Sequence, residues 1–134
     1  AEGGNRACYT PALDAINMPT RKQFKTAPGY YSTLLHECAH STGASNRLDR
    51  DLMGRFGREA YAFEELVAEL SAAMTCGALG IDDEPRDDHA KYMQSWLNVL
   101  RQDKKAIFKA STLAKDASKY ILAYDMAEQL DEAA

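Results

Sequence analysis

The chain has 134 residues, of which 46% are hydrophobic and 27% are charged, and its formal net charge at pH 7 is −4. This size and composition are typical of one soluble globular domain, and no apolar run is long enough to span a membrane. The acidic balance argues against a domain that holds nucleic acid through its own phosphate contacts.

The first residues and the cysteines indicate whether the chain is part of a longer protein and in which compartment it works. It begins Ala1-Glu2-Gly3-Gly4, with neither an initiator Met nor a signal-peptide pattern, so we expect residues 1–134 to be a single module of a longer protein. Three cysteines without a C-x-x-C pair favour a reducing cytoplasm over a disulfide framework. We interpret each as a small, buried hydrophobic residue; they are Cys8, Cys38 and Cys76.

The predicted elements begin with two short strands, the only persuasive β signal in the chain. Residues 8–10 and 15–18 alternate loosely around a turn at Pro11-Ala12-Leu13-Asp14, and Pro19 ends the second run. We therefore expect a small sheet or hairpin near the N-terminus.

A first helix is predicted to begin after Thr26, a suitable N-cap, with Pro28 in its first turn and Gly43 at its end. His36 and His40 lie on this helix, outside its predicted buried stripe. That stripe follows apolar residues that recur at three- and four-residue steps: Tyr31, Leu34, Leu35, Cys38 and Thr42.

Three more helices follow a loop at residues 44–58. The second helix is predicted over 59–79, and an acidic linker at 81–88 separates it from the third, over 88–102. A fourth is predicted over 104–130. The third has an apolar face made of Tyr92, Met93, Trp96, Leu97 and Leu100. The predicted fold class is α+β, mostly helical, with about four helices and the small sheet.

His36-Glu37-Cys38-Ala39-His40 places two histidines four residues apart on the first helix. Four residues make about 1.1 turns, so both rings project from one face and can converge on one Zn²⁺. Glu37 is rotated by about 100° from His36, so it does not share the metal but can reach a water held there. We predict His36 and His40 as ligands and Glu37 as the general base. The alternative is two partly exposed histidines beside a surface carboxylate.

A catalytic zinc needs a third protein ligand and an open position for water. Ten residues after His36 the chain has Asn46, whose neutral amide is a poor zinc ligand. The second helix offers Glu65 and Glu69 on one face, where a nearby cation would remove the cost of two buried like charges. We predict Glu65 as the ligand and Glu69 as the acceptor that orients a ligating histidine. Glu69 or Glu64 as ligand, and a solvated acidic face, are the alternatives.

Further segments accompany the metal motif along most of the chain. They are His36-Glu37-x-x-His40-Ser41-Thr42-Gly43, Arg47-Leu48, Phe56-Gly57, Glu64-Glu65-Leu66-Val67-Ala68-Glu69-Leu70, Leu79-Gly80-Ile81, His89-Ala90-x-Tyr92, Ser95-Trp96-Leu97 and Asp103-Lys104-Lys105-Ala106-Ile107-Phe108. Together, over residues 6–122, they resemble the zincin-like metallopeptidase domain of the ArdC antirestriction proteins and TraC-type plasmid primases. Relatives often carry a further histidine where this chain has Ala44.

The resemblance implies a gluzincin-type zincin fold and a cytoplasmic, zinc-dependent hydrolase that cleaves peptide bonds in a protein or peptide substrate. It also implies an association with antirestriction and DNA protection on plasmids and other mobile elements. The family's metallopeptidase domain usually follows a single-stranded-DNA-binding domain. We therefore expect this chain to be the C-terminal module of a longer protein, with such DNA contact only through a missing N-terminal domain and with no membrane partner. The alternative is a non-proteolytic, metal-binding accessory domain.

Zincins commonly add a donor that stabilises the oxyanion of the tetrahedral intermediate. The candidates are Tyr30, Tyr61, His89 and Tyr92, of which His89 and Tyr92 lie in a family-like segment. The plainer interpretation is a helix-terminal role for His89 and a core role for Tyr92.

Two further expectations concern the surfaces around the metal motif. The strand at residues 15–18 is the candidate edge for pairing with an extended peptide substrate. The loop after the first helix is expected to neutralise its own charge, because Asp49 and Asp51 interleave with four arginines: Arg47, Arg50, Arg55 and Arg58.

Overall fold

The computed structural model describes the backbone of residues 3–55, 57–84 and 89–133, and the side chains of these residues other than 89–92 and 125–133. Within them lie four α-helices: α1 (Ala27–Thr42), α2 (Arg58–Leu79), α3 (His89–Gln102) and α4 (Ala106–Ala133). A two-stranded antiparallel sheet, β1 (Cys8–Thr10) and β2 (Ala15–Asn17), and a 3-10 helix at Arg21–Gln23 precede them. The predicted α+β class is therefore confirmed.

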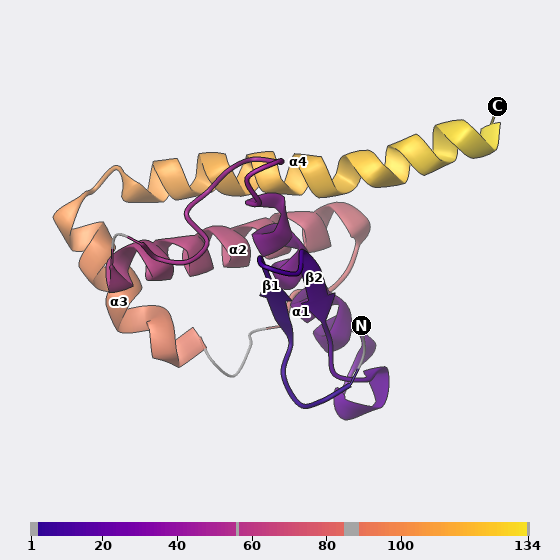
Figure 1. The fold of residues 1–134 in the computed structure, drawn as a ribbon, viewed down its shortest axis with the longest axis horizontal. Coiled ribbons are helices and arrows are strands. Elements are labelled where there is room, and N and C mark those ends of the chain that lie inside the picture. The colour runs from indigo at the N-terminus through magenta and orange to yellow at the C-terminus, as the bar shows by residue number, and fades with distance from the viewer. Residues whose placement is uncertain (1–2, 56, 85–88, 134) are drawn as a thin grey trace.

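The α2 helix occupies the middle of the molecule, where α1 and α4 both pack against it (Figure 1). The hairpin lies against α1. The α3 helix packs against the N-terminal part of α2, where the indole N–H of Trp96 donates to the carbonyl oxygen of Ala62 at 2.7 Å. The C-terminal part of α4 extends past the other elements (Figure 1). No helix in the described ranges is long and apolar enough to cross a membrane.

The helix ends lie close to the residues that predicted them. Thr26 caps α1, because its Oγ1 accepts the amide N–H of Gly29 at 3.0 Å. Gly80 ends α2 in the left-handed region, with φ of 70°. The last helix begins two residues later than predicted, because the Asp103 carboxylate accepts the amide of Lys105 at 2.9 Å and holds a turn there. Residues 85–88 of the predicted linker lie outside the described residues.

The core between α2 and α4 is built from small side chains. Val67 is fully buried with Ala110 and Ala114. The hydroxyls of Thr75 and Ser118 hydrogen bond across the same interface at 2.8 Å. Larger side chains surround this centre: Phe63, Leu66, Leu70 and Leu113. Because alanine adds little bulk, the two helices can approach closely along this contact.

Two predicted apolar faces are wrong in part. On α1, Tyr31 is 47% exposed, whereas His36 is 1% exposed and Ala39 is fully buried. The reason is that α1 packs its histidine face against carboxylates of α2, so its polar side points inward. On α3, Met93 and Leu97 are 52% and 42% exposed.

Arg50 links the loop after α1 to both α1 and α2. Its side chain is 7% exposed, and Nε donates to the two carboxylate oxygens of Glu64 at 2.8 and 3.2 Å. Its Nη1 donates to Oγ1 of Thr42 at 3.0 Å, and Nη2 to the carbonyl oxygen of Ala39 at 2.7 Å. Gly43 permits this approach, since a Cβ there would lie 3.0 Å from an Nη atom of Arg50.

The expected self-neutralised loop is therefore correct only in part. Arg55 remains within the loop, with Nε 3.7 Å from Oδ1 of Asp51. Arg47 and Arg50 instead bind carboxylates of the hairpin turn and of α2. The loop thus joins the elements around it.

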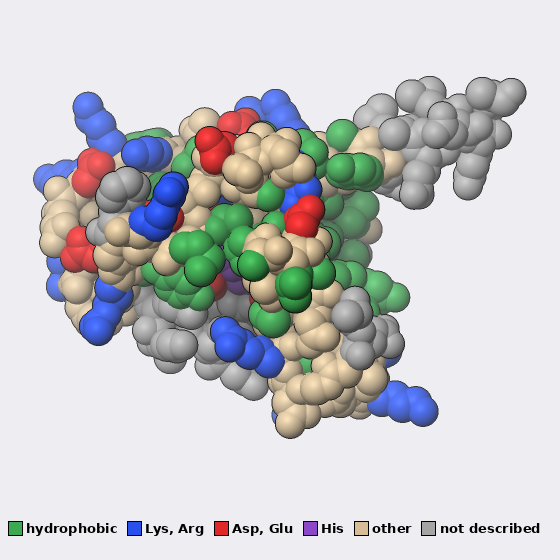
Figure 2. Space-filling model, in the orientation of Figure 1, with side chains coloured by type: hydrophobic (Ala, Val, Ile, Leu, Met, Phe, Trp, Pro, Cys, Tyr) green, Lys and Arg blue, Asp and Glu red, His purple; other side chains and the backbone are tan. Residues whose placement is uncertain are grey.

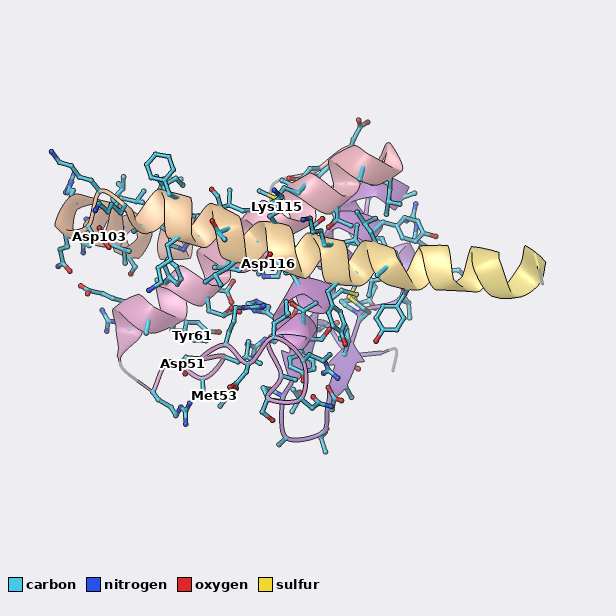
Figure 3. All side chains as sticks on the ribbon, turned by 90° about the horizontal axis from the view of Figure 1, so that it is seen from above. Asp51, Met53, Tyr61, Asp103, Lys115 and Asp116 are labelled. Atoms are coloured by element: carbon cyan, nitrogen blue, oxygen red, sulfur yellow. The ribbon has the colours of Figure 1, made fainter. Side chains whose placement is uncertain are left out.

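We expect Ala114→Leu to destabilise the domain by about 1–3 kcal/mol, because extra methylenes at the contact between α2 and α4 force the helices apart. Lys115→Leu is the matched control, since Lys115 is exposed on the same helix (Figure 3). Urea denaturation followed by circular dichroism measures the difference. Equal stability of the two variants would contradict the small-residue packing.

We expect Arg50→Met to cost about 3–5 kcal/mol of unfolding free energy, because it leaves the buried Glu64 carboxylate without its cation. Arg55→Met is the control, since the Arg55 side chain is 76% exposed and removal of a surface ion pair costs within about 1 kcal/mol. Chemical denaturation of both variants is the measurement. A loss below that of the control would show that Arg50 does not hold these elements together.

Candidate metal centre

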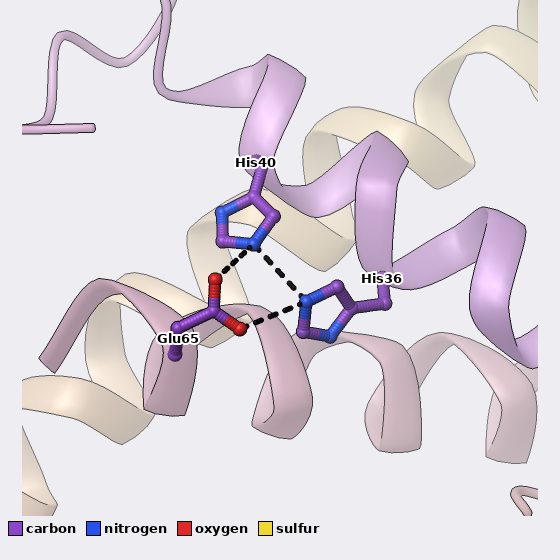
Figure 4. A group of neighbouring side chains, drawn as sticks. All are labelled: His36, His40 and Glu65. Atoms are coloured by element: carbon purple, nitrogen blue, oxygen red, sulfur yellow. Dashed lines mark hydrogen bonds and ion pairs between the residues drawn. The ribbon is translucent and has the colours of Figure 1, made fainter. Parts of the chain in front are cut away.

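Side chains from α1 and α2 converge at one point between the two helices (Figure 4). The Nε2 atoms of His36 and His40 lie 3.0 Å apart. Oε1 of Glu65 is 3.1 Å from Nε2 of His40, and Oε2 is 3.3 Å from Nε2 of His36. Each residue thus offers one ligand atom, and these atoms lie within 4.8 Å of one another.

These separations fit a four-coordinate metal ion. Donors at about 2.0–2.1 Å from a tetrahedral ion lie about 3.3 Å from each other, close to the 3.0, 3.1 and 3.3 Å found here. Two imidazoles and a carboxylate are also a donor set that divalent first-row metals accept. Three protein donors leave a fourth position, which a catalytic site needs for water or substrate.

The site buries an acidic side chain between two imidazoles. Glu65 is 6% exposed and His36 is 1% exposed. Burial alone would raise the pKa of the Glu65 carboxyl, but hydrogen bonds and charge from His36 and His40 outweigh burial and hold that pKa below its usual range. The carboxylate therefore carries the negative charge that a cation would meet.

The other glutamates of α2 have separate partners. Oε1 of Glu69 lies 2.6 Å from Nδ1 of His36. With a cation at the site, a proton on that Nδ1 would leave the lone pair on Nε2, the atom that faces Glu65 and His40, available to bind the metal. The Glu64 carboxylate accepts hydrogen bonds from the guanidinium of Arg50. Oε1 of Glu64 is 4.0 Å from Nδ1 of His40, which is too far for a hydrogen bond.

Glu37 shares a cleft with the three converging residues. The cleft has a volume of about 920 Å³, and its walls include His36, Glu37, His40, Tyr61 and Glu65. Glu37 itself is 5% exposed. Figure 2 shows the histidine colour at the bottom of a hollow, between two groups of hydrophobic side chains. The candidate metal-binding side chains and the Glu37 carboxylate therefore line one space.

The remaining candidates occupy different places. Tyr61 lines the cleft and lies near Met53 of the preceding loop (Figure 3). Tyr30 instead stacks edge-on against Phe24, with ring centroids 5.3 Å apart. The side chains of His89 and Tyr92 lie outside the described residues. Of the two candidate tyrosines whose side chains are described, Tyr61 rather than Tyr30 lines the cleft.

The cysteine inside the metal motif is partly buried, close to its expected core role. Burial and the charge of Glu37 raise the pKa of the Cys38 thiol to about 11. The thiol is therefore protonated at neutral pH, which disfavours Cys38 as a ligand or nucleophile.

The strand beside the cleft is β1, not the predicted edge at residues 15–18. Residues 5–11 line the cleft, whereas residues 15–18 do not. The backbone N–H of Tyr9 in β1 donates to Oε2 of Glu37 at 2.9 Å. Sequence reasoning missed this contact, because a backbone amide leaves no signature in the residue type.

Comparison with known proteins gives matches along nearly the whole chain. Residues 1–113 match the family described as zincin-like metallopeptidase. An uncharacterized protein of Sinorhizobium fredii, y4eC, is 47% identical over 97% of this chain and 42% of its own length. A DNA primase TraC of Escherichia coli is 43% identical over 91% of this chain, which is 8% of the primase.

Solved structures of the antirestriction protein ArdC from plasmid R388 share the fold. The Mn(II)-bound structure has a TM-score of 0.76 and 49% identity over 85% of this chain and 42% of ArdC. The metal-free structure has a TM-score of 0.75 and 46% identity, over 85% and 41%. The chain thus spans less than half the length of these relatives, and it belongs to the zincin-like metallopeptidase family.

Proposed function

We propose that this domain is a zinc-dependent peptidase in which His36, His40 and Glu65 hold the metal and Glu37 is the general base. The observation that carries the proposal is the convergence of three donor atoms from two helices beside a buried carboxylate in one cleft. Neither helix could assemble this group alone. A packing arrangement without function would have no reason to bury two histidines and two glutamates together.

Zinc is the metal that we propose, although one of the ArdC structures similar to this domain contains Mn(II). Two imidazoles and one carboxylate with an open fourth position are a donor set found in catalytic zinc sites. The bound ion would polarise the scissile carbonyl and lower the pKa of water. The contact of Glu69 with Nδ1 of His36 supports metal binding, because it leaves Nε2 of the same ring to bind the ion.

The protein's own groups supply the remaining steps of hydrolysis. Glu37 would take a proton from the attacking water and pass it to the leaving amine. Tyr61 lines the same cleft, and its phenol would donate a hydrogen bond to the oxyanion. A segment that contains β1 lines one wall, and an extended peptide can align with a strand edge of this kind. We therefore propose a protein or peptide substrate.

The context of the relatives indicates where such a domain acts. ArdC is an antirestriction protein and TraC is a DNA primase, so we infer that the full-length protein works at DNA. The net charge of −4 favours DNA contact through other parts of that protein rather than through this domain.

A non-proteolytic, metal-binding accessory domain is the alternative. A purely structural zinc is usually required for folding, yet the chain resembles metal-free and metal-bound ArdC almost equally well, with TM-scores of 0.75 and 0.76. This similarity favours a metal that serves chemistry rather than folding.

We expect each chain to bind one zinc ion. Zinc should raise the free energy of unfolding by about 2.7 kcal/mol when its free concentration is 100 times its dissociation constant. His36→Ala, His40→Ala and Glu65→Ala should each lose this stabilisation. Glu37→Gln should keep zinc but lose about 10²- to 10⁴-fold in hydrolysis of a quenched fluorescent peptide library. Calorimetry and thermal melts measure binding, and fluorescence measures turnover.

Glu59→Gln is the matched control, because Glu59 is an exposed carboxylate on α2 that does not line the cleft. It should change neither zinc binding nor turnover. Zinc binding with no hydrolysis in the unsubstituted protein would support the accessory-domain alternative. Turnover that survives Glu37→Gln would contradict the assigned base.

A further inference from the structure

We propose that the backbone N–H of Tyr9 positions the Glu37 carboxylate, and that the Tyr9 side chain fixes the hairpin that carries this N–H. The inference rests on the proposed role of Glu37 as the base. Tyr9 is then a positioning residue: it acts through Glu37 and does not itself contact the reacting atoms.

The register of the hairpin determines where this N–H points. Tyr9 is paired with Ile16, with Cys8 opposite Asn17 and Thr10 opposite Ala15. In an antiparallel pair, the N–H and C=O groups of one residue both face the partner strand or both face away. The N–H of Tyr9 donates to Glu37, so this residue directs its backbone groups away from β2 and toward α1.

The Glu37 carboxylate needs an external group to fix its orientation. The last torsion of a glutamate side chain is broad, so rotamer preference leaves the carboxylate plane undefined. Glu37 is 5% exposed, so water is a poor substitute for a donor from the protein. The N–H bond to Oε2 restricts this torsion, and a carboxylate has lone pairs to accept further bonds.

The hairpin that supplies this N–H is itself held by a latch made of Tyr9, Asp14 and Arg47. The phenol of Tyr9 donates to Oδ1 of Asp14 at 2.7 Å. Nη1 of Arg47 donates to Oδ2 of Asp14 at 3.2 Å, and Nη2 donates to the Tyr9 phenol at 3.3 Å and to Oδ1 of Asp14. Nε of Arg47 donates to the carbonyl oxygen of Ser41 at 2.8 Å. Because Ser41 directly follows His40, the latch ties the hairpin turn to the end of α1.

Charge and backbone geometry support the same arrangement. The hydrogen bonds from Arg47 and from Tyr9 lower the pKa of the Asp14 carboxyl, which favours the ionised form that the latch needs. Asp14 has φ of 46°, in the left-handed region that aspartate tolerates better than most residues. A two-stranded hairpin this short is not stable alone, so its position depends on such contacts.

Amide hydrogen exchange of the full chain, measured by NMR with and without zinc, tests the proposal. In Glu37→Ala we expect the residue 9 amide to exchange about tenfold faster or more, because a bond to a charged acceptor is lost. Glu37→Gln should retain most of the protection, because its amide oxygen still accepts. Tyr9→Phe keeps the N–H but removes the phenol and its two hydrogen bonds from the latch, so residue 9 should again exchange faster.

Two controls separate positioning from loss of the fold. Leu13→Ala changes an exposed residue of the same turn that has no part in the latch, and it should leave exchange at residue 9 unchanged. The amide of Gly29, which donates to Thr26 at the start of α1, should keep its protection in every variant. Fast exchange at residue 9 in the unsubstituted protein, or no difference between it and Glu37→Ala, would overturn the proposal.

Turnover provides a second measurement that a purely structural role would not reproduce. Tyr9→Phe should lower kcat while zinc affinity stays unchanged, because the substitution disturbs the hairpin that orients Glu37 but not α1 and α2, which carry the proposed metal ligands. An equal loss of zinc affinity would overturn the positioning role. If the unsubstituted protein hydrolyses no peptide, the proposed function fails, and the exchange pattern still decides whether Tyr9 holds Glu37.

Discussion

The structure depends on one constraint: negative charge buried between α1 and α2 must be compensated. Glu64 and Glu65 are 3% and 6% exposed, and their neighbour Glu69 lies on the same helix. Each would be costly to bury without a partner. The chain meets this constraint with the two histidines of α1, which face Glu65, and with Arg50, which faces Glu64. The interface between these helices is therefore held by charge, whereas that between α2 and α4 is held by small apolar side chains.

The candidate site accordingly has two packed helices on one side and a small hairpin on the other. The atoms that we propose as metal ligands project from two packed helices, so their separations are set by helix packing. The carboxylate of Glu37 also projects from α1, but its partner is the backbone of β1. The hairpin contributes little to the core, and its position depends on the contacts of Arg47 with Asp14 and Ser41. We therefore propose that the helices hold the metal and that the hairpin orients the base.

The fold and much of the candidate site could be predicted because they depend on signals that lie close together in the sequence, such as helix caps and residue spacing. Thr26, Gly43 and Gly80 mark helix ends by capping, and spacing alone places His36 with His40 on one face. The contacts that the sequence did not reveal join residues through space. The partner of Arg50 is 14 positions away, and no pattern in the loop distinguishes it from the exposed Arg55. The apolar stripe on α1 failed because it assumed an apolar neighbour, whereas α1 packs against carboxylates.

The central claim is that the side chains of residues 36, 40 and 65 share one cation, and anomalous diffraction at the zinc absorption edge tests it most directly. Crystals grown with zinc should show one peak about 2.0–2.1 Å from both Nε2 atoms and from a carboxylate oxygen of Glu65. A peak bound by Glu64 or Glu69 in place of Glu65, or no peak between α1 and α2, would contradict the account.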